Sequence, residues 1–194
     1  MKKVVMSFIA LMIFVNLVFA QEATVQDNTS FMYGGPAGKY VQVSPDLNIY
    51  YREAGTGTPF IIIPGWTAAS EHFVKQIAYF SDRYRVISYD PRSQGDSSKT
   101  WENNNYTQHG EDLKAFMDAL ELNDVILMGH SAGCADAYAY FRAYGTDNVK
   151  AFICIDSNFK AVSETEGEWG DPFTYEGTKG FFNILIYNRK EWIR

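Results

Sequence analysis

Short apolar runs alternate with helix-like patterns along most of this chain. Several runs are almost uniformly apolar, which is typical of strands buried on both faces of a parallel sheet. Between them, apolar residues recur with helical spacing, as at Phe73, Ile77 and Phe80. Strands that alternate with helices predict an α/β protein with a mostly parallel central sheet and helices on both faces. The predicted strands, of which the last four are the uniformly apolar ones, are residues 40–43, 47–53, 60–63, 85–89, 125–128 and 151–155.

Two further helices are predicted from the same kind of spacing. One covers residues 134–144, and Gly145 after it suits the left-handed conformation that ends many helices. The other is marked by apolar residues three and four positions apart, which would form one buried face. These residues are Leu113, Phe116, Met117 and Leu120.

The N-terminus predicts an export signal. Two lysines precede an uninterrupted apolar segment over residues 4–15, and Val18 and Ala20 are small residues at the positions that a signal peptidase reads. We therefore expect residues 1–20 to be a signal peptide, with Gln21 as the new N-terminus of a secreted or periplasmic protein. The alternative is an uncleaved signal that anchors the chain in a membrane.

The rest of the composition is that of one globular domain. Of the 194 residues, 46% are hydrophobic and 21% are charged, and the formal net charge is −6. An acidic chain without a Lys/Arg cluster argues against a nucleic-acid partner, and no membrane partner is expected once the signal is removed. We expect a linker over 21–38, a core over 39–157 and the start of a cap or lid over 158–194, where aromatic residues occur without strand periodicity.

The chain has two cysteines, Cys134 and Cys154. Both fall in segments predicted as core, where a free cysteine packs as a small apolar residue. We therefore favour two buried thiols over a disulfide, although export would permit one. No group of His, Cys, Asp or Glu has the spacing of metal ligands, so no metal or other cofactor is expected. The glycines of residues 34–40 precede a strand rather than a helix, unlike a phosphate-binding loop.

The most informative motif is Gly129-His130-Ser131-Ala132-Gly133, which directly follows the strand predicted over 125–128. A G-x-S-x-G sequence between a strand and a helix places the serine on a sharp turn, with its hydroxyl exposed at the C-terminal edge of the sheet. The glycines keep side chains from blocking the turn. The backbone N–H after the serine points at the same spot and can bind a developing oxyanion. Ser131 is therefore the candidate nucleophile.

Together with two other motifs, this serine turn resembles the α/β-hydrolase family. The similarity is greatest to small serine esterases and to the cofactor-free chloroperoxidase-like hydrolases. Residues 61–66 resemble the family's strand and oxyanion loop, with Pro64 in place of the usual histidine. Residues 90–97 are similar to the D-x-R-G-x-G-x-S motif, with Ser93 where glycine is usual. The order of the three motifs along the chain also matches the family.

The resemblance, which covers roughly residues 38–194, implies a mechanism. Ser131 would attack a small-molecule ester or related acyl substrate and form an acyl-serine intermediate. The backbone N–H groups of Trp66 and Ala132 would form the oxyanion hole. Asp90, Arg92 and Ser97 would form a structural turn. A serine at this position differs from the aspartate nucleophile of haloalkane dehalogenases and most epoxide hydrolases of this fold.

The other members of a catalytic triad are not found. In this family the acid and then the histidine follow the serine, normally after strands 7 and 8, and these strands are missing from the 194 residues. The chain therefore resembles a family member truncated at its C-terminus. His72, His109 and His130 are interpreted as structural or surface residues. Asp156, at the end of the last predicted strand, is a possible acid, although a structural role is favoured.

Two functional hypotheses stay open. The first is a serine hydrolase whose activity is impaired in this chain because a general base is missing; the same apparatus would also allow peroxide to attack the acyl-serine. The second, favoured by the missing histidine, is a non-catalytic remnant or binding module. The identity of the substrate and the oligomeric state do not follow from the sequence.

Overall fold

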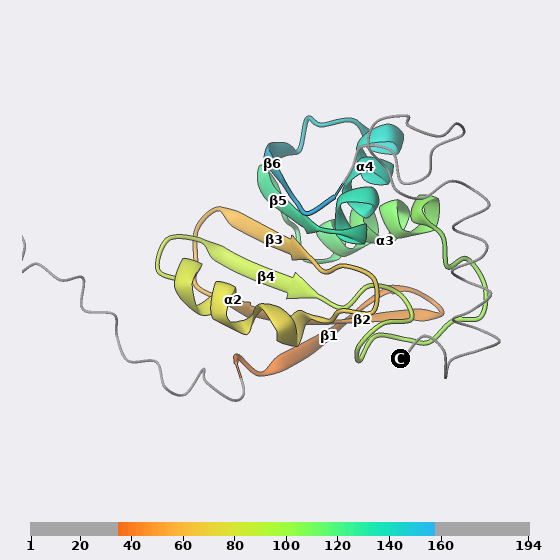
Figure 1. Cartoon of the computed structure of the whole chain (residues 1–194), viewed down its shortest axis with the longest axis horizontal. Coiled ribbons are helices and arrows are strands. Elements are labelled where there is room, and N and C mark those ends of the chain that lie inside the picture. Colours follow the sequence, from red (N-terminus) through yellow and green to blue (C-terminus); the bar gives the residue numbers. More distant parts are fainter. Residues whose placement is uncertain (1–34, 158–194) are drawn as a thin grey trace, which may run out of the picture.

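The computed structural model describes residues 35–157, so the predicted signal peptide, most of the linker and the predicted cap lie outside the described residues. A twisted sheet forms the centre of the molecule, with strand order β1-β2-β4-β3-β5-β6 (Figure 1). In chain order the elements are β1 (Gly38–Ser44), β2 (Leu47–Ala54), β3 (Pro59–Ile63), η2 (Ser70–Phe73), α2 (Val74–Phe80), β4 (Arg85–Tyr89), α3 (Tyr106–Ala119), β5 (Val125–His130), α4 (Ala132–Tyr144) and β6 (Val149–Ile155).

All the predicted strands are present, and the sheet is mostly parallel as predicted. β1 and β2 form an antiparallel hairpin, and β2 also runs antiparallel to β4. The remaining neighbours, β4 with β3, β3 with β5 and β5 with β6, are all parallel. The C-terminal ends of β3 and β5 therefore meet at one edge of the sheet, which is the edge where the predicted nucleophile lies.

β3 shows why the central strands are uniformly apolar. Its residues alternate between two separate cores, one on each face of the sheet. Phe60 and Ile62 pack with Ile77 of α2 on one face, while Ile61 and Ile63 join the larger core under α3 and α4 on the other. Figure 1 shows α2 on one side of the sheet and α3 and α4 on the other. The predicted helices on both faces are confirmed.

β6 differs from the prediction of a strand buried on both faces. Its Phe152 ring packs against Tyr138 and Phe141 of α4, with ring centroids 5.4 and 5.1 Å apart. On the opposite face, the side chains of Ile153 and Ile155 are 42% and 43% exposed. Among the described elements, β6 pairs only with β5, so it lies at the edge of the sheet. An apolar run predicts a strand, but it does not predict which neighbours that strand has.

The helices begin and end at recognisable residues. The Asn105 side chain accepts a hydrogen bond of 3.0 Å from the backbone N–H of Gln108 and so caps the start of α3. Gly145 ends α4, as its sequence position predicted, with φ 74 and ψ −162; the φ is positive, but the ψ is extended and not that of the left-handed helical conformation. Within residues 35–157, none of the helices combines the length and apolar character needed to cross a membrane.

Candidate active site

Ser131 forms the sharp turn between β5 and α4. Its backbone has φ 51 and ψ −119, a conformation that residues other than glycine rarely adopt. The Ser131 N–H donates a 2.9 Å hydrogen bond to the carbonyl of Ile155, and its own carbonyl accepts one of 3.0 Å from the Cys134 N–H. These hydrogen bonds hold the strained turn between the end of β6 and the first turn of α4. The strand–turn–helix geometry expected around Ser131 is therefore present.

The two glycines of the motif allow α4 to pack directly on main chain. A Cβ on Gly129 would lie 2.6 Å from the backbone nitrogen of Cys134, and a Cβ on Gly133 would overlap the carbonyl oxygen of Ile63. In both cases the added Cβ would be much closer than van der Waals contact allows. Only glycine therefore fits at these two positions, and α4 is seated against the backbone of both β3 and β5.

The loop after β3 lies against the serine turn. A Cβ built on Gly65 would be 3.1 Å from the Cβ of Ser131 and 3.1 Å from the carbonyl oxygen of His130. The next residue, Trp66, is 54% exposed, so its side chain is only partly packed against the rest of the protein. The assignment of the Trp66 and Ala132 N–H groups as oxyanion donors stays a prediction, but the loop and the turn that carry them are neighbours.

Two of the three histidines have structural contacts. The Ala69 N–H donates a 3.1 Å hydrogen bond to Nδ1 of His72, which closes the turn before α2. The His130 ring packs edge-on against Phe73, with centroids 6.1 Å apart. Within residues 35–157, no histidine ring is hydrogen-bonded to the Ser131 hydroxyl. The general base is therefore not found among the described residues.

The third histidine, His109, joins α3 to α4 through a pair that the sequence did not predict. Its Nδ1 lies 3.1 Å from Oδ1 of Asp136, and both side chains are largely buried. Burial lowers the pKa of His109, but the hydrogen bond and the charge of Asp136 outweigh it, so this pKa is raised overall. Burial also raises the pKa of the Asp136 carboxyl. The pair connects the helix that follows Ser131 to its neighbour, which is a structural role.

The motif at residues 90–97 folds as a tight structural turn around one buried carboxylate. Asp90 accepts hydrogen bonds from the N–H groups of Ser70 (2.6 Å) and Asp96 (2.7 Å). Ser97 Oγ donates a 2.6 Å hydrogen bond to the carbonyl of Asp90. Ser93 has φ 63, which explains why the related motif carries glycine at this position.

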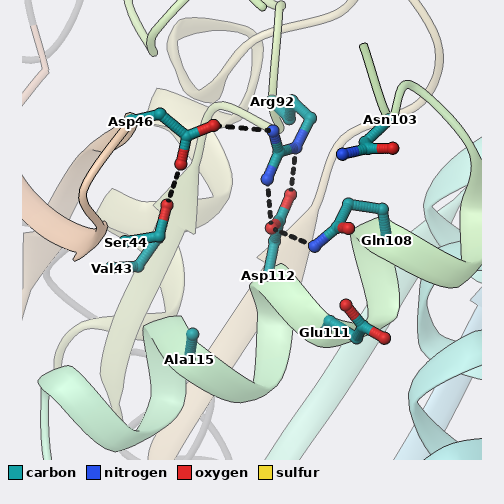
Figure 2. Close-up of a pocket in the computed structure, with 9 residues that line it drawn as sticks. All are labelled: Val43, Ser44, Asp46, Arg92, Asn103, Gln108, Glu111, Asp112 and Ala115. Atoms are coloured by element: carbon teal, nitrogen blue, oxygen red, sulfur yellow. Dashed lines mark hydrogen bonds and ion pairs between the residues drawn. The ribbon is translucent and has the colours of Figure 1, made fainter.

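Arg92 of the same motif is buried in a bidentate ion pair with Asp112 of α3 (Figure 2). Arg92 Nε and Nη2 donate to the two carboxylate oxygens at 2.8 and 2.7 Å, and the hydrogen bonds to Asp112 raise the pKa of the guanidinium. Asp46 lies 3.9 Å from Arg92 Nη1. A depression of about 230 Å³ surrounds the pair. Its lining includes neither Ser131 nor the loop at Trp66, so we assign it to the structural ion pair.

Asp156, the possible acid, follows β6 at the same edge of the sheet as Ser131. The preceding residue, Ile155, is paired in register with His130, so β5 and β6 end side by side. Asp156 has φ 55 and an exposed side chain. Within residues 35–157 it makes no hydrogen bond to a histidine, and its role as a triad acid stays a prediction.

The two cysteines are free thiols, but only Cys134 is buried. The prediction that both are buried is wrong for Cys154, which is exposed because β6 lies at the edge of the sheet among the described strands. In the described part of the chain, no group of three or more His, Cys, Asp or Glu side chains gathers as metal ligands would.

Comparison with known proteins agrees with this geometry. A family model described as the alpha/beta hydrolase fold matches residues 58–177. A non-heme haloperoxidase from Rhodococcus erythropolis is 27% identical over 79% of this chain and 56% of its own length. A bifunctional esterase/perhydrolase from Acinetobacter calcoaceticus is 24% identical over the same shares of each chain.

A solved structure shows the same arrangement in space. The crystal structure of a bromoperoxidase from Bacillus anthracis has a TM-score of 0.73 and 27% identity, and the match covers 80% of this chain and 57% of that one. The matches span 56% of the length of the two curated relatives from Rhodococcus and Acinetobacter and 41% of a putative non-heme chloroperoxidase from Synechocystis. The family model covers more than half of the sequence, and the matched residues include β3 to β6 and the turn at Ser131. The chain belongs to the α/β-hydrolase family.

Proposed function

We propose that Ser131 is the nucleophile of a hydrolase that acts on an ester or a related acyl compound through an acyl-serine intermediate. The observation that carries this proposal is the backbone of Ser131, which is held at positive φ between two positions where only glycine fits. Such strain costs on the order of 1–3 kcal/mol, is maintained by the surrounding packing and clusters at active sites. The name of the Acinetobacter relative, an esterase/perhydrolase, supports the same class of reaction.

The proposed reaction uses few groups. Ser131 Oγ loses its proton to a base and bonds to the substrate carbonyl carbon; the ester C–O bond then breaks, and the leaving oxygen takes the proton from the base and departs as an alcohol. Water then hydrolyses the acyl-serine. The N–H groups of Trp66 and Ala132 would stabilise the oxyanion, and losing one such donor typically costs about 3–4 kcal/mol. A serine without its base is a weak nucleophile: removing the histidine of a serine-protease triad costs about 10⁶ in turnover.

The second candidate function is a non-catalytic remnant or binding module. It is favoured by one specific observation, that within residues 35–157 no histidine ring is hydrogen-bonded to the Ser131 hydroxyl. The fold and the serine turn would then be retained without the activation that the nucleophile needs. The two candidates differ in one measurable property, which is the reactivity of Ser131.

A fluorophosphonate probe separates these candidates, because the probe labels only an activated serine. The full chain would be incubated with the probe, digested and mapped by mass spectrometry. Label on Ser131 that disappears in Ser131→Ala supports the hydrolase. Ser98→Ala is a matched control, since that hydroxyl only accepts a hydrogen bond of 2.9 Å from the Asn48 N–H, and it should label as the wild type does. A folded chain without label at Ser131 would favour the non-catalytic function.

We also propose perhydrolysis as a variant of the same chemistry. Its support is that relatives carry the names haloperoxidase and perhydrolase. Peroxide, instead of water, would attack the acyl-serine and release a peracid, and the peracid would oxidise halide. Halogenation that requires both acetate and peroxide, and that is lost in Ser131→Ala, would establish this variant. Ester hydrolysis without such halogenation would leave plain esterase chemistry.

Export is a further part of the proposal. It rests on the basic start, the apolar segment and the small residues Val18 and Ala20. Intact-mass measurement of the exported protein should show Gln21 as its first residue. A membrane-bound product that still begins at Met1 would establish the uncleaved anchor instead.

A further inference from the structure

Cys134 of α4 and Cys154 of β6 lie on the same side of the sheet. Cys154 is paired in register with Gly129 of β5, and in a parallel pair such partners point their side chains to the same face. A Cβ built on Gly129 would point at Cys134, and it would lie 2.6 Å from the backbone nitrogen and 2.7 Å from the Cα of that residue. Cys154 therefore points toward the first turn of α4, where Cys134 lies.

The packing around the two residues agrees with this placement. Phe152 lies two positions before Cys154 on the same strand face, and its ring contacts Tyr138 of α4. Tyr138 is one helical turn after Cys134. The Cys134 Sγ lies 3.9 Å from the carbonyl oxygen of Ile155, the residue directly after Cys154. Burial and the neighbouring Cys154 thiol raise the pKa of Cys134 to about 12.

We propose that Cys134 and Cys154 form a redox-active pair that closes to an intramolecular disulfide when the chain meets a disulfide oxidant. The exposed Cys154 thiolate attacks one sulfur of the oxidant, forming a mixed disulfide and releasing one thiolate. The Cys134 thiolate then attacks the Cys154 sulfur, forming the Cys134–Cys154 bond and releasing the second thiolate. The protein loses two protons and two electrons, and the oxidant is reduced to two thiols.

The disulfide joins β6, at the edge of the described sheet, to α4, the helix that begins directly after Ser131. β6 pairs with β5 alone among the described strands, so a covalent link to α4 limits how far it can separate from the sheet. The second step uses the buried thiol, whose high pKa leaves little thiolate at neutral pH. Closure is therefore slow near pH 7, and its rate rises about tenfold per pH unit while thiolate is scarce.

The test uses the full chain, reduced, freed of reductant and incubated with oxidised glutathione. We expect the chain to lose the mass of two hydrogen atoms, to protect both thiols from alkylation and to yield a Cys134–Cys154 linked peptide. Its melting temperature should rise by several degrees above that of the reduced chain. Cys154→Ser is the control, because that side chain is exposed: it should fold and should show neither the bridge nor the shift.

Three results would overturn the proposal. One is a chain that keeps both thiols alkylatable after prolonged exposure to the oxidant at about pH 9. Another is a stable glutathione adduct on Cys154 without closure, which would mean that Cys134 is out of reach. The third is a disulfide-linked dimer through Cys154. None of these measurements depends on the reactivity of Ser131, so this pair and the proposed hydrolase function are tested separately.

Discussion

Replacing Ser131 by glycine is expected to give a more stable protein than replacing it by alanine. The Ser131 backbone has φ 51 and ψ −119, which glycine adopts freely and which a residue with a Cβ adopts only under strain. Both variants lack the hydroxyl, so any function of the side chain is lost equally. The comparison therefore isolates the backbone strain of the turn.

The size of the effect follows from two opposing terms. A residue held in such a sparsely populated conformation stores about 1–3 kcal/mol, which alanine retains and glycine releases. The greater freedom of glycine in the unfolded chain offsets about 0.4–1 kcal/mol of that gain. Ser131→Gly should therefore exceed Ser131→Ala by about 1–2 kcal/mol. At about 2–4 °C per kcal/mol for a domain of this size, that corresponds to a difference of roughly 2–8 °C in melting temperature.

Thermal or urea unfolding of the two variants measures this difference directly. Ser81 provides the matched control, because it has ordinary helical angles, φ −69 and ψ −13, and a hydroxyl that donates 3.0 Å to the carbonyl of Ala78. There the sign should reverse, with glycine less stable than alanine by about 0.5–1 kcal/mol. If Ser131→Gly is no more stable than Ser131→Ala, the turn is not strained, and the backbone of Ser131 does not support its assignment as the nucleophile.

Three more predictions concern the ion pairs and the sheet edge. Because Asp136 is what raises the pKa of His109 against burial, Asp136→Asn should lower that pKa, as measured by NMR titration of the imidazole. In the wild type, the raised pKa of His109 contributes to the free energy of unfolding. This contribution is complete below pH 6.5, the ordinary pKa of histidine, and is lost as the pH rises through the pKa in the folded state. Urea unfolding across this pH range should therefore show a free energy of unfolding that depends less on pH in Asp136→Asn. Asp112→Ala removes the bidentate partner of the buried Arg92 and leaves this guanidinium with the longer, 3.9 Å contact to the exposed Asp46, so urea unfolding should show a loss of about 3–5 kcal/mol, and a loss below 1 kcal/mol would contradict the structural role. The apolar edge strand should drive self-association of the chain, and Ile153→Lys should reduce it in sedimentation velocity; equal association of the two proteins would locate the contact elsewhere.

The central part of the fold could be predicted because strands that are buried on both faces must consist almost entirely of apolar residues. A strand such as β3, covered on both faces, requires apolar residues at successive positions, so Phe60 to Ile63 reads as a buried strand. β6 has the same composition, yet its outer face is exposed in the described structure. The composition of a strand shows which of its side chains are apolar enough to be buried. The order of the strands in the sheet determines which neighbours cover those side chains. Strand order depends on long-range pairing that no local pattern contains.

The same distinction explains which parts of the site were predictable. The turn at Ser131 was found because its requirements are local: a strand, small flanking residues and a helix within a short stretch. The contact between His109 and Asp136 and the approach of Cys134 to Cys154 join residues far apart in the sequence. Each depends on how α3, α4 and β6 pack, and a single histidine or cysteine in the sequence gives no sign of its partner.

The contact between Gly133 and the Ile63 carbonyl makes one mechanical unit of two segments distant in the sequence. The helix that begins after Ser131 rests on the last residue of β3, and Pro64 continues that strand into the loop that carries Trp66. The spacing between the serine and the loop is therefore set by main chain against main chain. This contact involves backbone atoms of Ile63 and Pro64 and no loop side chain, so side chains in the loop can be exchanged without altering it. In such a scaffold the loop side chains can diverge while the position of Ser131 relative to the loop backbone stays constant.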